Sequence, residues 1–252
     1  MQDINLKPIG VVHSPYKQKF AIPRQPNLVP AGRGTIELFS DFTDLNCLRG
    51  IEHFSHLWVL FFFHATAERG WSSTVQPPRL GGRRKVGVFA SRSPFRPNPI
   101  GISVLKYRDH VLFEGKVCIE VQGIDILDGT PVIDIKPYIP YADALEDANG
   151  SYANTKPAAD FEVSFTNEVE YKLKELEGNF PKLKTFISQV LSQDPRPPWR
   201  AKYSDSKQYG MTLFDFNIKW EVQTNQILVN AIHALQNDKQ KQHFAIGEDS
   251  VK

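Results

Sequence analysis

Short apolar runs separated by Gly, Pro and Asp residues dominate the first half of the chain. Runs rich in β-branched and aromatic residues predict strands, here at residues 9–12, 34–39, 56–64, 85–90, 100–107, 116–124 and 132–138. The run 57–63 is apolar throughout, which predicts a strand covered on both faces. Only residues 41–54 predict a helix in this half, and a short one.

Strands that follow one another with almost no crossover helix cannot build a doubly wound parallel sheet. The pattern therefore predicts a mainly β fold whose first part is an antiparallel β-barrel without a Rossmann sheet.

The pattern changes after residue 140. Residues 141–160 are small, polar and without period, which predicts a linker or covering loop. Apolar residues at helical spacing predict helices over 167–180 and 181–193, and two apolar runs around Thr224 and Asn225 predict a hairpin. We expect a small α+β C-terminal domain, with domain bounds at 1–160 and 161–235 and a polar, frayed tail at 236–252.

Composition adds few constraints. The net charge of +2 over 252 residues gives no global argument for nucleic acid. Two cysteines far apart, Cys47 and Cys118, fit a reducing compartment and predict small buried side chains. No signal peptide or membrane-length apolar run is visible, so we expect a cytoplasmic protein. His53 and His56 lack a partner at metal-ligand spacing, so we expect no metal site.

Four segments depart from a plain barrel. The segment 20–32 holds Arg24 and Gln25 between Pro23 and Pro26, and a surface loop is its simpler interpretation. His64 ends the apolar strand and either is satisfied in the core or faces a cavity.

The other two segments are a loop and a turn. The segment 88–101 sets Arg92 and Arg96 among three prolines, which suits an anion such as a carboxylate or phosphate, although pairing with an acid for stability competes. The sequence "DGTP" from Asp128 to Pro131 is a turn signal whose backbone could also hold the polar edge of a ligand.

Together these segments carry a resemblance to a known family. The stretches "PRQP", "FSHLWVLFFFH", "PPRLGG", "VFASRSPFRPNPIG" and "DGTPVIDIKPY" resemble the TsaA-like family, whose bacterial members include TrmO-type tRNA methyltransferases. The later "QDPRPPWR" and "DFNIKW" are similar to the C-terminal region of those members, so the resemblance spans about residues 9 to 222.

The resemblance implies a homodimeric barrel enzyme that binds S-adenosylmethionine near the subunit boundary. It implies methylation of the exocyclic N6 of threonylcarbamoyladenosine beside the tRNA anticodon. The cofactor contacts that it implies are Pro23, Arg24, Gln25, His64, Ala65, Arg92, Leu105, Asp128, Gly129, Thr130 and Pro131.

Two roles remain open within this hypothesis. The proton acceptor is unassigned, with His64 and Asp128 as candidates. Contacts to the anticodon loop of the tRNA are expected from basic residues, with Trp71 and Trp199 as possible stacking partners. The basic residues are Arg83, Arg84, Lys85, Arg96, Arg196 and Arg200.

Two other functions remain compatible with the residues. One is a non-catalytic RNA-binding barrel, which would keep the basic residues but has no need of the "PRQ" and "DGTP" segments. The other is a methyltransferase of the same fold that acts on a different substrate.

Overall fold

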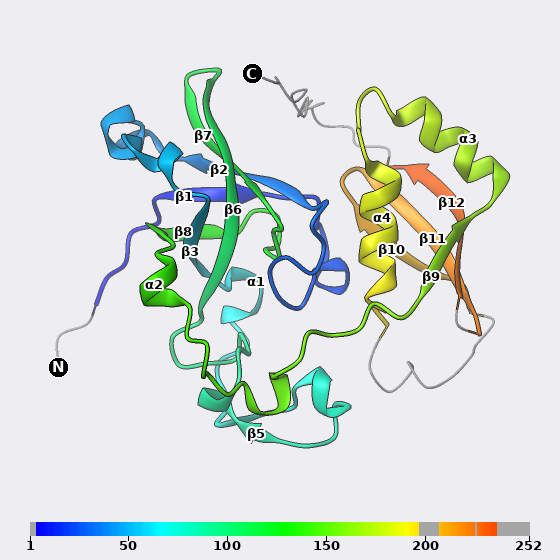
Figure 1. Ribbon diagram of the computed structural model, residues 1–252, viewed down its shortest axis with the longest axis horizontal. Coiled ribbons are helices and arrows are strands. Elements are labelled where there is room, and N and C mark those ends of the chain that lie inside the picture. The colour runs from blue at the N-terminus through cyan, green and yellow to red at the C-terminus, as the bar shows by residue number, and fades with distance from the viewer. Residues whose placement is uncertain (1–3, 197–206, 225, 236–252) are drawn as a thin grey trace.

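The chain forms two packed units (Figure 1), seen in a computed structural model that describes residues 4–196, 207–224 and 226–235. The first unit carries the blue to green strands of Figure 1, and the second carries the yellow to orange elements. Within these described ranges, no helix has the length and apolar character needed to cross a membrane.

Six antiparallel strands make up the first unit. Each pairs with two neighbours in the order β1-β2-β7-β6-β3-β8, and β8 pairs back with β1, so the sheet closes into a barrel. The mainly β prediction is confirmed. The strands are β1 (Gly10–His13), β2 (Arg33–Leu38), β3 (His56–Phe62), β6 (Ile100–Phe113), β7 (Lys116–Gln122) and β8 (Pro131–Pro137).

Alternate side chains of these strands fill the barrel, as the pleat requires. Val12, Ile36, Val59 and Ile119 are fully buried. In β3 the intervening residues are half-buried, so its outer face is only partly covered despite its apolar sequence.

Short turns connect the strands and correct three predictions. Residues 41–54 form no helix but three 3₁₀ turns, because Gly50 takes a left-handed φ of 89° and breaks the run. The predicted strand at 85–90 is only two residues long, because its sole strand partner, β4, spans two residues. Cys47 lies on one of the turns and is exposed, whereas Cys118 is buried as predicted.

These connecting elements are short throughout. They are η1 (Lys19–Ala21), η2 (Ser40–Phe42), η3 (Leu45–Leu48), η4 (Ile51–His53), α1 (His64–Ala67), β4 (Thr74–Val75), η5 (Pro78–Leu80), β5 (Val86–Gly87), η6 (Val88–Ala90), α2 (Pro140–Asp143) and η7 (Ser151–Ala153).

In its described residues, the second unit is a four-stranded mixed sheet with two helices. Its order is β10-β11-β12-β9, and only the β12–β9 pair is parallel. The elements are β9 (Glu162–Phe165), α3 (Asn167–Leu176), α4 (Leu183–Ser192), β10 (Tyr209–Leu213), β11 (Phe216–Gln223) and β12 (Gln226–Ala234).

Both predicted helices are present, and the strands differ in two ways. Strand β9 was not predicted, since its four residues lie at the end of a polar stretch. The segment before Thr224, which was predicted to be one strand, forms the two antiparallel strands β10 and β11. Phe214, with a φ of 51°, turns the chain between them. Asn225 and the predicted tail 236–252 lie outside the described residues.

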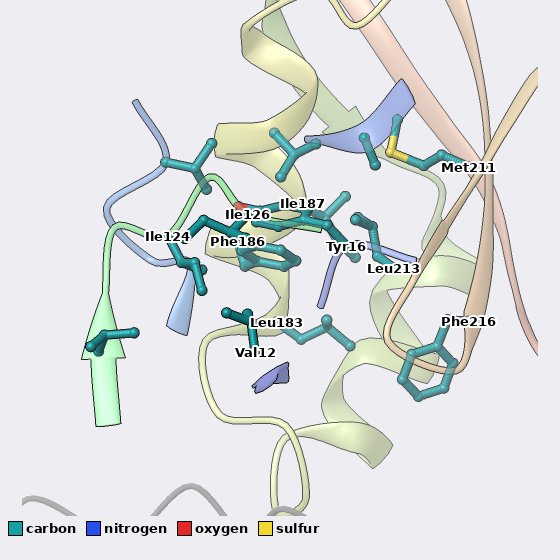
Figure 2. Close-up of a cluster of buried hydrophobic side chains, with 14 of the residues drawn as sticks. Val12, Tyr16, Ile124, Ile126, Leu183, Phe186, Ile187, Met211, Leu213 and Phe216 are labelled. Carbon is teal, nitrogen blue, oxygen red and sulfur yellow. The ribbon is translucent and has the colours of Figure 1, made fainter. Parts of the chain in front are cut away.

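One continuous core joins the two units (Figure 2). Tyr16 from the barrel side is fully buried, and its ring centroid lies 5.8 Å from that of Phe186 in α4. Ile124 and Ile126 of the barrel unit and Leu213 of β10 belong to the same buried cluster. Because the two units share their core, we expect them to unfold together.

Backbone contacts reinforce this junction. Tyr16 forms an isolated β-bridge with Leu213, and the Phe214 amide donates to the Pro15 carbonyl at 2.8 Å. The Ala31 amide donates to the side-chain oxygen of Gln189 in α4, also at 2.8 Å.

Replacing Phe186 by Ala should destabilise both units at once. The buried ring packs against Tyr16 and Phe214, so its removal leaves a cavity, and we expect the free energy of unfolding to fall by about 3–5 kcal/mol. Urea denaturation followed by fluorescence and by circular dichroism measures this change. Tyr171→Ala, at a side chain that is 68% exposed, is the control and should cost less than about 0.5 kcal/mol. Two separate transitions in the parent protein would contradict the shared core.

Candidate functional site

The long connection between β1 and β2, residues 14–32, carries Pro23, Arg24 and Gln25. It contains only one short turn of regular structure, and a second segment, 123–130, holds it by backbone hydrogen bonds. The Asn27 amide donates to the Gly123 carbonyl at 2.9 Å, and the Gly123 amide donates to the Gly32 carbonyl at 2.7 Å. Gly123 has a φ of 76°, and a Cβ there would lie 2.0 Å from Oδ1 of Asn27, so only glycine fits this crossing.

The "DGTP" turn fixes the start of the same connection. The Asp128 carboxylate accepts the Ser14 amide at 2.9 Å and pairs with Nζ of Lys17 at 2.7 Å. The Gly129 amide donates to the Val12 carbonyl, and the Val12 amide donates to the carbonyl of Thr130, whose side chain is buried. Pro131 then begins β8. The Asp128 carboxylate therefore holds a loop in place.

The loop 91–99 is braced by its own side chains and by β3. Nη1 of Arg96 donates to the carbonyls of Ser91 and Ser93, at 3.0 and 3.4 Å. The Phe63 amide, at the end of β3, donates to the Pro99 carbonyl at 2.8 Å. This bond places the loop next to α1, whose first two residues are His64 and Ala65.

Arg92 joins this loop to the "PRQ" segment. Its Nη1 donates to Oε1 of Gln25 at 2.7 Å, across 67 residues of sequence. Two of the predicted segments therefore meet side chain to side chain, and the Pro99 bond brings a third, the end of β3, beside them.

Asp125, in the segment 123–130, is affected by the charge of Arg92 and was not among the predicted site residues. Oγ of Ser103 in β6 donates to its Oδ1 at 2.6 Å. Burial raises the pKa of Asp125 to about 7, while the Ser103 bond and the charge of Arg92 act in the opposite direction. One signal was present: a carboxylate between Ile124 and Ile126, both fully buried, must point away from their core, toward the site.

Tyr16 connects this carboxyl to the core. Burial raises the pKa of Tyr16 well above its ordinary value, and the charge of Asp125 adds to the effect. Its hydroxyl is buried without a hydrogen-bond partner among the described residues.

Two of the predicted cofactor contacts, Leu105 and Arg24, lie apart from Gln25, Arg92 and Asp125. The Leu105 side chain is fully buried in the barrel, where its backbone pairs with Leu57. Arg24 lies toward the second unit: burial lowers its pKa, and the nearby Asp194 carboxylate opposes that shift.

The structure places the predicted RNA contacts differently. Arg96 belongs to the braced loop 91–99. Arg83, Arg84 and Lys85 are exposed on the turn before β5. Arg196 is 1% exposed, pairs with Asp194 through Nε and Nη2 at 2.8 and 3.0 Å, and lies over the Phe161 ring. A buried, paired guanidinium cannot reach RNA in this conformation, so the prediction that Arg196 contacts RNA does not fit the structure.

The remaining residues predicted to contact RNA lie either on the surface or outside the described residues. Trp71 is 59% exposed. Arg200 and Trp199 lie outside the described residues.

Two surface pockets lie near these segments. One of about 230 Å³ is lined by residues of both units, namely Gln18, Gly210, Met211, Thr212, Asn217 and Lys219. One of about 90 Å³ lies beside α1 and the loop 91–99, lined by Ala67, Gly70, Trp71, Pro94, Arg96, Pro97 and Pro99. Neither lining includes Arg24, His64, Arg92 or Gly129. Over the described ranges, no group of three or more His, Cys, Asp or Glu side chains is arranged to hold a metal ion.

Comparison with known proteins gives consistent matches along the chain. The tRNA-methyltransferase O N-terminal domain matches residues 11–144, and the TrmO C-terminal domain matches residues 158–235. A tRNA (adenine(37)-N6)-methyltransferase of Escherichia coli K12 is 50% identical over 222 residues, 88% of this chain and 94% of that protein.

Other relatives and a solved structure extend this result. A putative S-adenosylmethionine-dependent methyltransferase of Pseudomonas aeruginosa is 43% identical, over 86% of this chain and 91% of that protein. A crystal structure of TrmO from P. aeruginosa superposes with a TM-score of 0.76 at 38% identity, and covers 93% of this chain and 99% of that one. With both domain models matched in order and half of the aligned residues identical to one relative, the chain belongs to the tRNA-methyltransferase O family.

Proposed function

We propose that this protein methylates tRNA with S-adenosylmethionine at the exocyclic N6 of threonylcarbamoyladenosine, beside the anticodon. The observation that carries the proposal is a link between four separate segments: Arg92 donates to Gln25, Ser103 donates to Asp125, and the charge of Arg92 acts on the Asp125 carboxyl. The relatives' names, which specify N6 of adenine 37 and S-adenosylmethionine, support the reaction class.

The side chains present fit the proposed cofactor. S-adenosylmethionine carries a carboxylate, and the guanidinium of Arg92 uses Nη1 for Gln25 while it has further N–H donors for an anion. The backbone of residues 128–131 offers polar groups to an adenine edge. Pro23, His64 and Ala65 belong to the same implied set. Arg24 and Leu105 belong to it by resemblance alone, because Arg24 lies toward the second unit and the Leu105 side chain is fully buried in the barrel.

A second copy of the chain completes the pocket in this proposal. Phe89 is 79% exposed just before the loop 91–99, and Ile102 is 45% exposed on β6 beside Ser103. Burial of such side chains in a homodimer removes apolar area from water and closes the site around Arg92. We assign the cofactor and the methyl transfer to residues 1–160, and the support of the loop 14–32 to residues 161–235.

Asp125 is the proton acceptor in this proposal. S-adenosylmethionine held by these residues would supply an electrophilic methyl group, with a neutral thioether as the leaving group. The substrate nitrogen loses a proton as the N–C bond forms, and the carbamoyl group makes that nitrogen a weak nucleophile. A carboxyl with a pKa of about 7 is half ionised near neutral pH, which suits a general base. Asp128 is less suited, because both of its oxygens hold the loop 14–32.

The reaction itself is tested with purified protein, S-adenosylmethionine and two tRNA preparations. One preparation carries threonylcarbamoyladenosine beside the anticodon, and the other carries plain adenosine. Mass spectrometry of the digested nucleosides should show one added methyl on the modified nucleoside only. Methylation of both preparations would refute the substrate assignment, and cofactor binding without methylation of either would favour another substrate. Absence of cofactor binding would favour a non-catalytic RNA-binding protein.

Replacing Arg92 by Ala should weaken cofactor binding by roughly 10- to 100-fold, since a charge-assisted pair with a carboxylate is removed. Isothermal titration calorimetry with S-adenosylmethionine measures the change. Arg49→Ala is a matched control, because Arg49 also donates from one Nη to a single side-chain amide, that of Asn46, at 2.7 Å. Equal effects of the two substitutions would remove Arg92 from the proposed site.

The raised pKa of Asp125 makes stability depend on pH. The unfolded carboxyl ionises near its ordinary value of 3.8 and the folded one at about 7, so the folded state binds the extra proton between these values. Its contribution is therefore present below pH 4 and is lost as the pH rises to about 7. Relative to the parent, Asp125→Asn should gain stability across this range, by up to about 1.4 kcal/mol for each unit of pKa shift. Denaturation at a series of pH values tests it, and a difference that does not change with pH would contradict the shift.

The same substitution should lower kcat by about 100-fold or more, with little change in cofactor affinity. His64 is a second candidate for the base, so the pH profile of the parent alone does not assign the titrating group. The comparison with Asp128→Asn and His64→Gln does. Only the variant of the true base should lose the rising limb of the kcat profile, and Asp128→Asn should lose stability instead.

A further inference from the structure

A cluster of cations and aromatic rings lies beside the proposed site, and the proposed methyl transfer does not use it. It is made of Lys19 in η1, Arg69 and Trp71 after α1, and Phe95 and Arg96 of the loop 91–99. These side chains come from three segments that the fold brings to one surface.

Lys19 and Arg69 bring positive charge to the same loop: Lys19 lies over the Phe95 ring, and Arg69 directly precedes Gly70, which lines the 90 Å³ pocket. Partial burial, followed by the charge of Arg69, lowers the pKa of Lys19 below its ordinary value of 10.5. Among the described residues neither cation forms an ion pair with a carboxylate, and Nζ of Lys19 instead lies 5.2 Å from the Phe95 ring centroid. Two neighbouring cations without an acidic partner repel each other, and an anion placed between them removes that repulsion.

The Phe95 backbone leads from these cations to the 90 Å³ pocket. The Ser72 amide donates to the Phe95 carbonyl at 3.3 Å, which ties the chain after Trp71 to the loop 91–99. Trp71, Pro94, Pro97 and Pro99 give the pocket flat apolar walls, and Arg96 adds one charge to its lining. A flat, apolar wall with a cation at its edge suits an unstacked nucleobase better than an aliphatic ligand.

The position of this surface relative to the proposed site limits what can occupy it. Ala67 lines the pocket and belongs to α1, the short helix that begins at His64. Arg96 and Arg92 lie on the same braced loop. The pocket and the proposed site therefore share α1 and the loop 91–99, so an RNA bound at the proposed site lies close to the pocket.

We propose that Lys19, Arg69, Arg96 and Trp71 bind one nucleotide of the anticodon loop that neighbours the methylated nucleotide. Its phosphate lies between Lys19 and Arg69, and its base enters the pocket against Trp71. This site is separate from the exposed run Arg83–Lys85, and it rests on the proposed action on tRNA.

The phosphate half is tested with the double variant Lys19→Ala and Arg69→Ala in the full chain. Binding of an anticodon stem-loop RNA, measured by fluorescence anisotropy at several salt concentrations, should weaken by about 10- to 100-fold at low salt. The slope of log K against log salt should fall by about 0.7 for each phosphate that the variant no longer neutralises. Binding of S-adenosylmethionine should not change.

Two cations on α3 provide the matched control. Lys172→Ala with Lys174→Ala removes the same charge from the surface of the second unit and should have a much smaller effect. An equal drop in RNA affinity in the two double variants would refute the phosphate site and leave only a general effect of net charge.

The contact between the nucleobase and Trp71 is tested by RNA affinity and its salt dependence. Trp71→Ala should weaken RNA binding by about 10-fold without changing the salt slope, because no charge is removed, and Trp71→Phe should restore most of the affinity. Trp71→Ala that binds RNA as the parent does would refute the base pocket.

The behaviour of the parent protein shows whether the proposed tRNA methylation or only the nucleotide site is wrong. If the parent binds S-adenosylmethionine but no tRNA, the proposed function fails, and this site fails with it. If the parent binds and methylates tRNA while the variants at Lys19, Arg69 and Trp71 match their controls, only this site fails.

Discussion

The hydrogen bonds between the segments 14–32 and 123–130 are the constraint on which the site depends. A connection of nineteen residues with almost no regular structure loses much conformational entropy when it is fixed in one shape. Here Gly123 and Asp128 fix it at both ends, by backbone bonds to Asn27, Gly32 and Tyr16 and by the carboxylate bonds to Ser14 and Lys17. Only a connection held in this way can present Gln25 to Arg92 at a fixed distance.

The second unit holds the same connection from its other side. Its α4 supplies Phe186 to the ring of Tyr16 and Gln189 to the amide of Ala31. The loop that carries the "PRQ" segment is thus fixed by the barrel on one side and by the C-terminal unit on the other. This gives the C-terminal unit a role in positioning the site that needs no contact of its own with cofactor or RNA.

The sequence predicted the barrel strands and the two helices well, because their patterns are local. It failed where tertiary partners decide the structure. Residues 41–54 have helical composition, but the extended Asp44 and the left-handed Gly50 interrupt the run. Strand β9 forms against the parallel edge that β12 offers it. Among the site residues, Arg92 and Gln25 stood out by their proline context. Arg196 was predicted to contact RNA, yet it is buried and paired with Asp194 beside the Phe161 ring.

Asp125 was not found because its role depends on what surrounds it, and not on its neighbours in sequence. The adjacent "DGTP" turn is the stronger local signal, but the carboxylate of that turn is used in bonds that hold the backbone. Asp125 instead accepts a hydrogen bond from Ser103 and is affected by the charge of Arg92. Its own charge helps to raise the pKa of Tyr16, whose buried hydroxyl has no hydrogen-bond partner among the described residues. A buried carboxyl with a raised pKa and a hydroxyl without a partner both reduce stability. Selection for stability alone would replace such groups by apolar ones, and this cost is the reason that the proposed function gives Asp125 a chemical task.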